Sequence, residues 1–427
     1  MRNRMITALK KYGLLGFLIK LLKKVSYKVF KFFNDIDRKI LEKKQEKEKN
    51  KNNEKFLFLE KICNDSKYKY IFIFYPYTEW NLPIFQRPQQ IALELANRED
   101  VLYLFCTANC VYDHVNVYEK IKENLYITTE FKFLTENIKT DKRIIHLYST
   151  DIVSKLDLVK AALERNDKIL YEYIDEIHED ITQSIPKDFW DKHNYIMNNE
   201  ECYIVTTADK LYDDVKKVRN KNFILATNGV TLNDFIIEEG YEIPNIMVEL
   251  KSKYEKLIGY YGALAKWFDY DLMNKVAKRY PNYAIVLIGI EYDDSLRKSK
   301  LLENKNVHYL GKIDYKELIK YSSQLDLLTI PFLINDITES TSPVKLFEYM
   351  ATKKPILTTA MKECKKYSSV NIANTHEEFI EKIPEVMEMY RDENYIKLLM
   401  KEASENTWHQ KSEDIINLLK GEEKWRK

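Results

Sequence analysis

The residues best placed to do chemistry lie in the segment ESTSPVKLFEYMATKKPILTT, residues 339–359. Ser342 is a preferred N-cap residue and Pro343 suits the first helical position, so the pattern predicts a helix that begins here. The polar loop 335–341 before it follows an apolar run that is typical of a buried strand. A helix that begins at the carboxyl edge of a parallel sheet offers free backbone N–H groups to an anion, and a pyrophosphate suits such a site.

Two charged side chains near the start of this helix extend the predicted anion site. Lys345 would add a mobile positive charge. Glu348 lies three residues further on the same face and could accept hydrogen bonds from sugar hydroxyls. The alternative is a surface ion pair between the two, worth roughly a few tenths of a kcal/mol. The segment taken alone is compatible with either interpretation.

A second group of candidates is the acidic stretch YIDEIHED, residues 173–180. Its potential metal ligands are Asp175, Glu176, His178, Glu179 and Asp180. An acidic first helical turn is favoured by the helix dipole without any ligand, so we expect no metal site here. Asp175 follows a predicted strand directly and should project toward the other half of the chain. There it could orient or deprotonate a hydroxyl group, or it could cap the following helix.

Arg87 precedes Pro88 at the start of a predicted helix over residues 87–98. A guanidinium group can bind a phosphate through two parallel hydrogen bonds. The alternative is a structural role in which Arg87 caps nearby carbonyl groups. The sequence supports phosphate binding and this structural role equally.

These residues must be positioned by strands and helices that alternate from Tyr68 onward. Predicted strands of the first half cover residues 68–76, 101–108, 143–149, 168–174, 202–208 and 222–230. Those of the second half cover 256–264, 283–289, 306–311, 325–332 and 355–359. Continuous apolar strands that alternate with helices indicate parallel sheets covered on both faces. The halves meet at Asn228–Gly229, a turn dipeptide suited to a hinge.

Composition excludes several classes of protein. A chain of 427 residues is too long for one compact core and suits two α/β domains. Lys and Arg (68) nearly balance Asp and Glu (66), and a net charge of +2 gives no reason to expect nucleic-acid binding. There is no G-x-G-x-x-G, G-x-x-x-x-G-K-[ST] or G-x-S-x-G motif. The five scattered cysteines are typical of reduced thiols in a cytosolic protein.

The N-terminal segment 1–34 has nine Lys or Arg residues and no Asp or Glu. Its apolar residues recur every three or four positions, which predicts one helical stripe with the lysines largely outside it. Such a helix can lie in a membrane interface without crossing it, and we expect it to bind an anionic membrane surface. The alternatives are a helix docked on the protein itself and a calmodulin-like target helix. No signal peptide is expected.

Residues 339–359 resemble the donor-binding motif of retaining glycosyltransferases with the GT-B fold, in particular glycosyltransferase family four. In that family two Glu are separated by seven residues, and the second binds the ribose of the nucleotide. Glu348 matches the second Glu and leads into EYMATKKPILTT, which is similar to the family's E-A-M-A-x-G-x-P-V-V. The first Glu falls on Ser340, with Glu339 one place off, so either residue could substitute.

Further segments carry the resemblance over most of residues 68–419. They are ATNGVTLNDF (226–235), IGYYGALAKWFDYDLM (258–273), NVHYLGKIDYKEL (306–318) and ENTWHQKSEDIINLL (405–419). In the second of them Ala263 replaces the family's usual Arg, and Lys266 is an approximate counterpart of its Lys. The segments QRPQQIALELA (86–96) and YEYIDE (171–176) resemble a narrower group that acts in cell-surface polysaccharide and teichuronic-acid assembly.

The resemblance implies an α/β protein with two Rossmann-like parallel-sheet domains facing a cleft. We expect an N-terminal helix (1–40), a charged linker (41–66), an acceptor-side domain (67–228), a donor-side domain (229–403) and a C-terminal helix that packs back on the first domain (404–427). The expected donor-binding residues are Gly262, Lys266, Gly289, Lys312, Ser340, Thr341, Ser342, Pro343, Lys345 and Glu348. Asp175 and Arg87 are the expected catalytic residues.

The implied activity is transfer of a sugar from a nucleotide-sugar donor to a glycan or lipid-linked acceptor. Retention at the anomeric carbon, with no metal or other cofactor, is part of the same expectation. We expect the protein on the inner face of the cell membrane, in the cytoplasm. The alternatives are a nucleotide-sugar epimerase on the same fold and a non-catalytic membrane-attached scaffold.

Overall fold

The computed structural model describes residue 39 and residues 53–178, 185–237 and 240–421 of the chain. The predicted amphipathic segment 1–34 lies outside the described residues, as do Glu179 and Asp180. Residues 53–63 were expected in a charged linker but form helix α2 (Asn53–Cys63). Its Phe56, Leu59 and Cys63 share one helical face and are buried in the first domain, which explains the difference.

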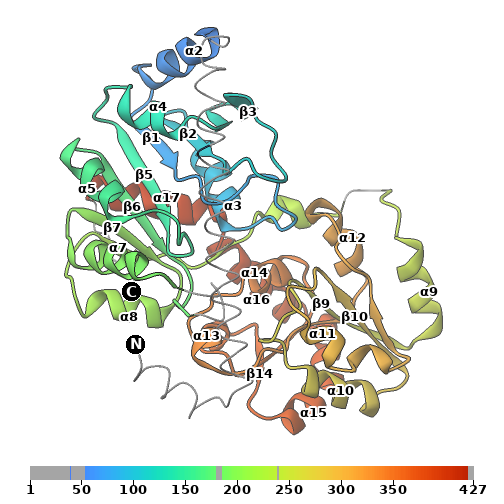
Figure 1. The fold of residues 1–427 in the computed structure, drawn as a ribbon. Coiled ribbons are helices and arrows are strands. Elements are labelled where there is room, and N and C mark those ends of the chain that lie inside the picture. The colour runs from blue at the N-terminus through green and yellow to red at the C-terminus, as the bar shows by residue number, and fades with distance from the viewer. Residues whose placement is uncertain (1–38, 40–52, 179–184, 238–239, 422–427) are drawn as a thin grey trace.

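The first domain is built on an eight-stranded sheet (Figure 1). In spatial order its strands are β3 (Tyr118–Lys122), β4 (Leu125–Thr128), β2 (Val101–Cys106), β1 (Tyr70–Phe74), β5 (Arg143–Tyr148), β6 (Lys168–Tyr173), β7 (Cys202–Thr206) and β8 (Phe223–Leu225). Neighbouring strands are parallel except for the edge pair β3–β4. Almost every residue of the central strands is buried, as expected for a sheet covered on both faces.

The second domain has a six-stranded sheet in which all pairs are parallel. Its order is β11 (Val307–Tyr309), β10 (Tyr283–Ile288), β9 (Lys256–Tyr261), β12 (Leu327–Ile330), β13 (Ile356–Thr359) and β14 (Asn371–Ala373). The chain order reverses between β9 and β12. A ligand of an open α/β sheet is expected beyond the carboxyl ends of the strands at this point.

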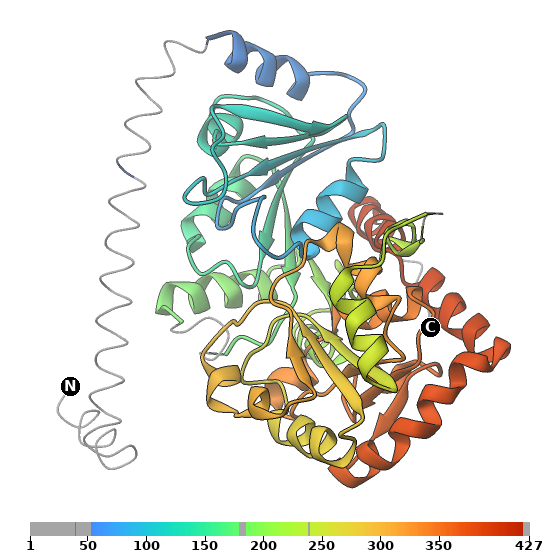
Figure 2. The same ribbon diagram turned by 90° about the vertical axis from the view of Figure 1, so that its right-hand side faces the viewer.

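Helices cover both sheets (Figures 1 and 2). The first domain has α3 (Arg87–Leu95), α4 (Phe131–Glu136), α5 (Leu156–Glu164), α7 (Lys187–Asn198) and α8 (Asp209–Lys216). The second has α9 (Asn245–Lys253), α10 (Tyr270–Arg279), α11 (Ser295–Lys298), α12 (Leu318–Ser322), α13 (Asp336–Glu339), α14 (Val344–Ala351), α15 (His376–Glu388) and α16 (Glu393–Glu405). Among the described residues, no helix is both long enough and apolar enough to cross a membrane.

Two crossings join the domains, and they lie side by side. Val230 of the first crossing pairs with Thr407 of the second, and the N–H of Val230 donates to the carbonyl of Asn406 at 3.0 Å. A Cβ atom on Gly229 would lie 2.9 Å from the backbone of residues 406–408, so only glycine allows this close approach. The predicted hinge at Asn228–Gly229 is therefore one of two adjacent chain segments that connect the domains, and the other lies at residues 406–408.

The second crossing leads into the last described helix, α17 (Trp408–Lys420). Helix α17 packs beside α3 of the first domain, and Figure 1 shows it in red within that domain. Its buried residues are Trp408, Lys411, Ser412, Ile415, Ile416, Leu418 and Leu419. The first domain is thus completed by the C-terminal end of the described chain.

Candidate functional site

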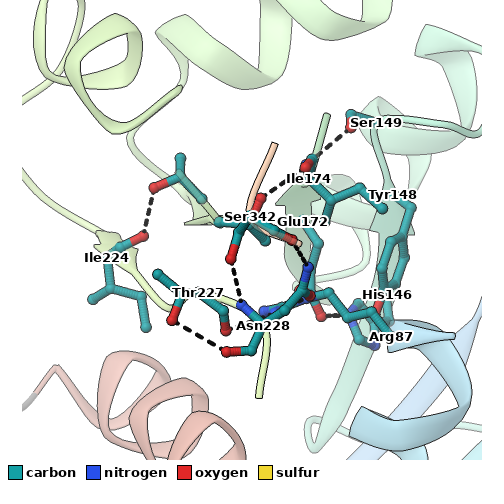
Figure 3. Close-up of polar contacts among 12 residues, drawn as sticks. Arg87, His146, Tyr148, Ser149, Glu172, Ile174, Ile224, Thr227, Asn228 and Ser342 are labelled. Atoms are coloured by element: carbon teal, nitrogen blue, oxygen red, sulfur yellow. Dashed lines mark hydrogen bonds and ion pairs between the residues drawn. The ribbon is translucent and has the colours of Figure 1, made fainter. Parts of the chain in front are cut away.

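The N-terminus of α14 lies next to the first crossing between the domains. Helix α14 has Pro343 as its N-cap and begins at Val344, one residue later than predicted. Ser342 does not cap the helix because its hydroxyl accepts from the N–H of Asn228 at 3.3 Å, while its carbonyl accepts from Asn228 Nδ2 at 2.6 Å (Figure 3). The expected anion site is therefore tied directly to the hinge.

Lys345 extends from the first turn of α14 toward the end of β9. Its Nζ lies 4.9 Å from the ring centre of Phe332 and 5.5 Å from that of Tyr260. Burial lowers the pKa of Lys345 to about 8, against the opposing effect of Glu348. The surface ion pair considered for these two residues is wrong, because Lys345 packs over aromatic rings and Glu348 is buried.

Glu348 lies one turn further along α14 and is only 6% exposed. Burial raises the pKa of Glu348 to about 7, against the lowering effect of Lys345. The Tyr261 hydroxyl is buried and interacts with the Glu348 carboxyl, and the Tyr315 hydroxyl is buried nearby with polar neighbours of its own. Neither hydroxyl makes a well-aligned hydrogen bond within the described residues. A buried carboxyl beside two such hydroxyls is an arrangement that can bind the hydroxyl groups of a ligand.

Two glycines lie at the ends of neighbouring strands, and Gly262 of this pair lies next to Lys345. Gly262 (φ 143°) and Gly289 (φ 140°) end β9 and β10 with backbone conformations that side chains rarely adopt. A Cβ on Gly262 would lie 2.5 Å from Cε of Lys345, and one on Gly289 would lie 1.9 Å from the carbonyl oxygen of Gly262. The missing side chains let the strand ends approach each other and the lysine closely.

The loop before α14 places Ser340, rather than Glu339, in contact with the first domain. Ser340 is fully buried, and its Oγ donates to Oε2 of Glu176 in the first domain at 2.6 Å. Glu339 is exposed at the end of α13. The hydroxyl of Thr341 donates to the carbonyl of Ile337 at 2.8 Å. Of the two predicted substitutes for the first family Glu, Ser340 is thus the residue that faces the other domain.

Two further lysines of the predicted donor site are Lys266 and Lys312. Both side chains are exposed, and Lys312 lies 3.9 Å from Asp314 in a surface ion pair. The backbone N–H of Lys266 donates to Asp293 at 3.1 Å. Their part in ligand binding stays a prediction.

Arg87 belongs to a buried polar network in the first domain (Figure 3). Its Nε pairs with Oε2 of Glu172, and its Nη1 donates to the carbonyl of Thr227 at 3.0 Å and to Oδ1 of Asn228 at 3.2 Å. The guanidinium also lies over Trp408 at the start of α17, 5.8 Å from the ring centre. These contacts favour the structural interpretation of Arg87, and its Nη2 is the only guanidinium nitrogen that the described residues leave without a partner.

Glu172 is the centre of this network. Its Oε1 accepts from Tyr148 at 2.8 Å and lies 3.0 Å from Nε2 of His146. Burial alone would raise the pKa of Glu172, but Arg87 and His146 together hold it down at about 2. The sequence contained a signal for this network, since Glu172 is the one charged residue among the buried positions of β6.

Asp175 lies two residues beyond the end of β6 and is partly buried. Burial raises the pKa of Asp175 to about 7, against the lowering effect of Arg87. Residues 175–178 form no helix, so the expected acidic helical turn does not begin at Asp175. A carboxyl group that titrates near neutral pH can act as a general base.

Metal binding has no candidate cluster in the part of the chain that the structure describes. No group of three or more His, Cys, Asp or Glu residues in these ranges is placed to hold a metal ion.

A hollow of about 510 Å³ lies at the opposite edge of the first sheet, lined by Lys67, Lys69, Glu99, Asp100, Glu123 and Asn124. Because ligands of parallel sheets bind at the carboxyl edge, we do not assign the donor to this hollow.

Comparison with known proteins agrees with this architecture. Residues 243–402 match the family described as "Glycosyl transferases group 1", and this range covers most of the second domain. A teichuronic acid biosynthesis glycosyltransferase of Bacillus subtilis (strain 168), TuaH, is 24% identical over 159 residues. The match covers 36% of this chain and 40% of that relative.

Solved structures share the fold over most of the chain. A sucrose-phosphate synthase from Thermosynechococcus elongatus has 13% identity and a TM-score of 0.60, covering 82% of this chain and 98% of its own. Anabaena HepE in complex with UDP-glucose has 12% identity and a TM-score of 0.55, covering 82% and 99%. The resemblance to GT-B glycosyltransferases is confirmed: the fold is GT-B, and the second domain matches a glycosyltransferase family.

Proposed function

We propose that this chain is a glycosyltransferase that takes a sugar from a nucleotide-sugar donor held by its second domain. The observation that supports this most directly is the group formed by Lys345, Glu348 and Gly262. It lies at the N-terminus of α14, beyond the carboxyl end of β9, within the range that matches a glycosyltransferase family.

Each residue of this group has a physical role in the proposal. The N-terminus of α14 and Lys345 would stabilise the charge on the departing diphosphate. Glu348, with Tyr261 and Tyr315 nearby, would bind the hydroxyl groups of the nucleoside. Gly262 leaves room for the lysine side chain, since a Cβ there would lie 2.5 Å from Cε of Lys345. Retention at the anomeric carbon and independence of metal ions are part of the proposal.

The acceptor belongs to the first domain in this proposal. It is a glycan or a lipid-linked sugar used in cell-surface polysaccharide synthesis, in line with the name of the Bacillus relative. Asp175 would orient or deprotonate the acceptor hydroxyl, and Nη2 of Arg87 could contribute a single contact to an acceptor phosphate.

Thermal unfolding of the full chain with nucleotides and nucleotide sugars tests the donor site. We expect one nucleotide family to raise Tm, because a ligand that binds only the folded state stabilises it; at 100 times Kd the gain is about 2.7 kcal/mol. If the protein unfolds cooperatively and none of the UDP-, GDP-, ADP- or CDP-sugars stabilises it, the alternative of a non-catalytic membrane-attached scaffold is favoured.

The role of Asp175 predicts the pH dependence of transfer. Burial raises its pKa to about 7, so the base is protonated in acid, and the rate should fall as pH decreases through about 7. Asp175→Asn should lose about 100-fold or more in kcat, since general-base catalysis contributes about that much. Initial rates from pH 5 to 9 measure the profile. An Asp175→Asn enzyme with the same rate and the same acid limb would remove this residue from the mechanism.

Attachment to the inner face of the cell membrane rests on the sequence of residues 1–34. We expect the full chain to float with vesicles that contain anionic lipid and to be released by high salt. Changing Lys20, Lys24 and Lys28 to Gln should weaken binding about 100-fold, at about 1 kcal/mol for each charge. Equal binding to neutral and anionic vesicles would contradict the electrostatic part of the proposal.

A further inference from the structure

Four polar residues, two from each domain, meet where the domains touch. Oε2 of Glu176 accepts from Ser340 Oγ at 2.6 Å and lies 3.0 Å from Nζ of Lys210. The same Nζ lies 3.3 Å from the backbone carbonyl of Asp336. Glu176 and Lys210 come from the first domain, while Ser340 and Asp336 come from the second. The cluster is therefore made only when the domains are together.

Glu176 is held firmly on the side of the first domain. The backbone just before it is fixed at Ile174, whose N–H donates to Ser149 Oγ at 3.1 Å (Figure 3). The carbonyl of Ile174 accepts from Thr207 Oγ1 at 2.7 Å. Both contacts anchor the segment beyond β6 to neighbouring strand ends. The carboxylate is thus aimed across the domain interface by the sheet.

Ser340 lies three residues before Pro343, the N-cap of α14. If the N-terminus of α14 binds the diphosphate, a sugar on its outer phosphate lies within reach of the loop 340–342, which contacts the first domain at Ser340 and the crossing at Ser342. The loop before α14 presents hydroxyl groups in this direction, whereas the side chains of Asp336 and Glu339 are exposed. The carboxylate that contacts the loop is supplied by Glu176 of the opposite domain.

We propose that Glu176 is a donor-specificity residue, which binds hydroxyl groups of the transferred sugar together with Ser340. This rests on the proposed function. Ser340 and Lys210 occupy Oε2, and the described residues leave Oε1 without a partner, so it can accept a hydrogen bond from a sugar hydroxyl. Because the carboxylate and the diphosphate site belong to different domains, the sugar is recognised only across the closed interface.

The affinity difference between a nucleotide sugar and its nucleoside diphosphate tests the proposal. Calorimetry on the full chain would use UDP-glucose with UDP, UDP-N-acetylglucosamine with UDP, and GDP-mannose with GDP. For the pair that the wild type binds, Glu176→Gln should weaken the nucleotide sugar about 10-fold and change the diphosphate less than about 2-fold. The double variant Glu176→Ser with Ser340→Glu, which moves the carboxylate onto the second domain, should recover part of the loss.

Lys210→Gln provides the matched control, because it removes the ion pair and keeps the carboxylate. If Glu176 only holds the domains together, Glu176→Gln should weaken both ligands equally and Lys210→Gln should have the same effect; this result would overturn the inference alone. If an ADP- or CDP-sugar is the ligand that stabilises the wild type, that sugar and its diphosphate form the test pair. A wild type that binds none of these ligands and is stabilised by no UDP-, GDP-, ADP- or CDP-sugar would overturn the proposed function and the inference with it. Cooperative unfolding of each variant, checked beforehand, separates these outcomes from misfolding.

Discussion

Replacing Glu348 by Gln is expected to stabilise the ligand-free protein at pH 8 while it removes most of the affinity for nucleotide sugars. Burial raises the pKa of Glu348 to about 7, whereas a carboxyl in the unfolded chain titrates at about 4.3. Folding therefore favours the protonated form, and the stability falls as pH rises from about 4.3 to 7 and stays reduced above it. Gln avoids this cost, which is about 3–4 kcal/mol at pH 8.

The loss of affinity has a separate cause. A hydrogen bond between a ligand hydroxyl and a charged group contributes about 1.5–3 kcal/mol, so Glu348→Gln should weaken the donor about 10- to 100-fold. Denaturant unfolding at pH 5 and pH 8 measures the first effect, and calorimetry measures the second. Glu339→Gln is the matched control, since Glu339 is exposed in the preceding helix α13 and should change neither quantity. A Glu348→Gln protein that is less stable at pH 8, or that binds donor normally, would contradict the assignment.

Replacing Arg87 by Leu is expected to destabilise the protein by about 3–5 kcal/mol, because it leaves the buried carboxylate of Glu172 without its main cation. Arg87 is 3% exposed and Glu172 is fully buried, so water cannot compensate for the loss. The wild type should also lose stability as pH falls from about 4.3 toward 2, since the pKa of Glu172 is lowered to about 2 in the folded state.

Two further variants separate the network from a phosphate-binding role of Arg87. The double variant Arg87→Leu with Glu172→Leu should recover much of the lost stability, because no unpaired charge remains buried. Arg98→Leu is the control: Arg98 pairs with Asp100 and Glu413 but is 24% exposed, so its loss should cost about 1 kcal/mol or less. An Arg87→Leu protein of normal stability that only requires more acceptor would favour the phosphate-binding role.

The sequence was sufficient for most strands of the two sheets but not for β3, β4 and β14. Strand β10 is a continuous apolar run and β5 is largely apolar, and the positions of both were predicted to within one residue. The edge strand β3 was missed because it is charged and largely exposed, with a pattern that resembles a loop. Strand β14 was missed because three residues, Asn371–Ala373, are too few to show a periodicity.

Candidate residues that lie close together in the sequence could be predicted from it. Contacts between residues of different domains could not. Ser342, Lys345 and Glu348 were predicted together because they lie within seven positions of one helix start, and their role stays a prediction. The partner of Ser340, Glu176, is 164 positions away, and only folding shows that they meet. The burial of Lys345 over Phe332 likewise depends on how the end of β12 packs against α14.

The return of α17 to the first domain has a consequence for the order in which the protein can form on the ribosome. Trp408, Ile415, Ile416 and Leu419 are buried in the core that also contains Phe72 and Tyr103. They are synthesised roughly 180 residues after the last strand of that domain. A nascent chain released before residue 420 therefore carries an open apolar face, and the first domain to be translated is the last to be finished.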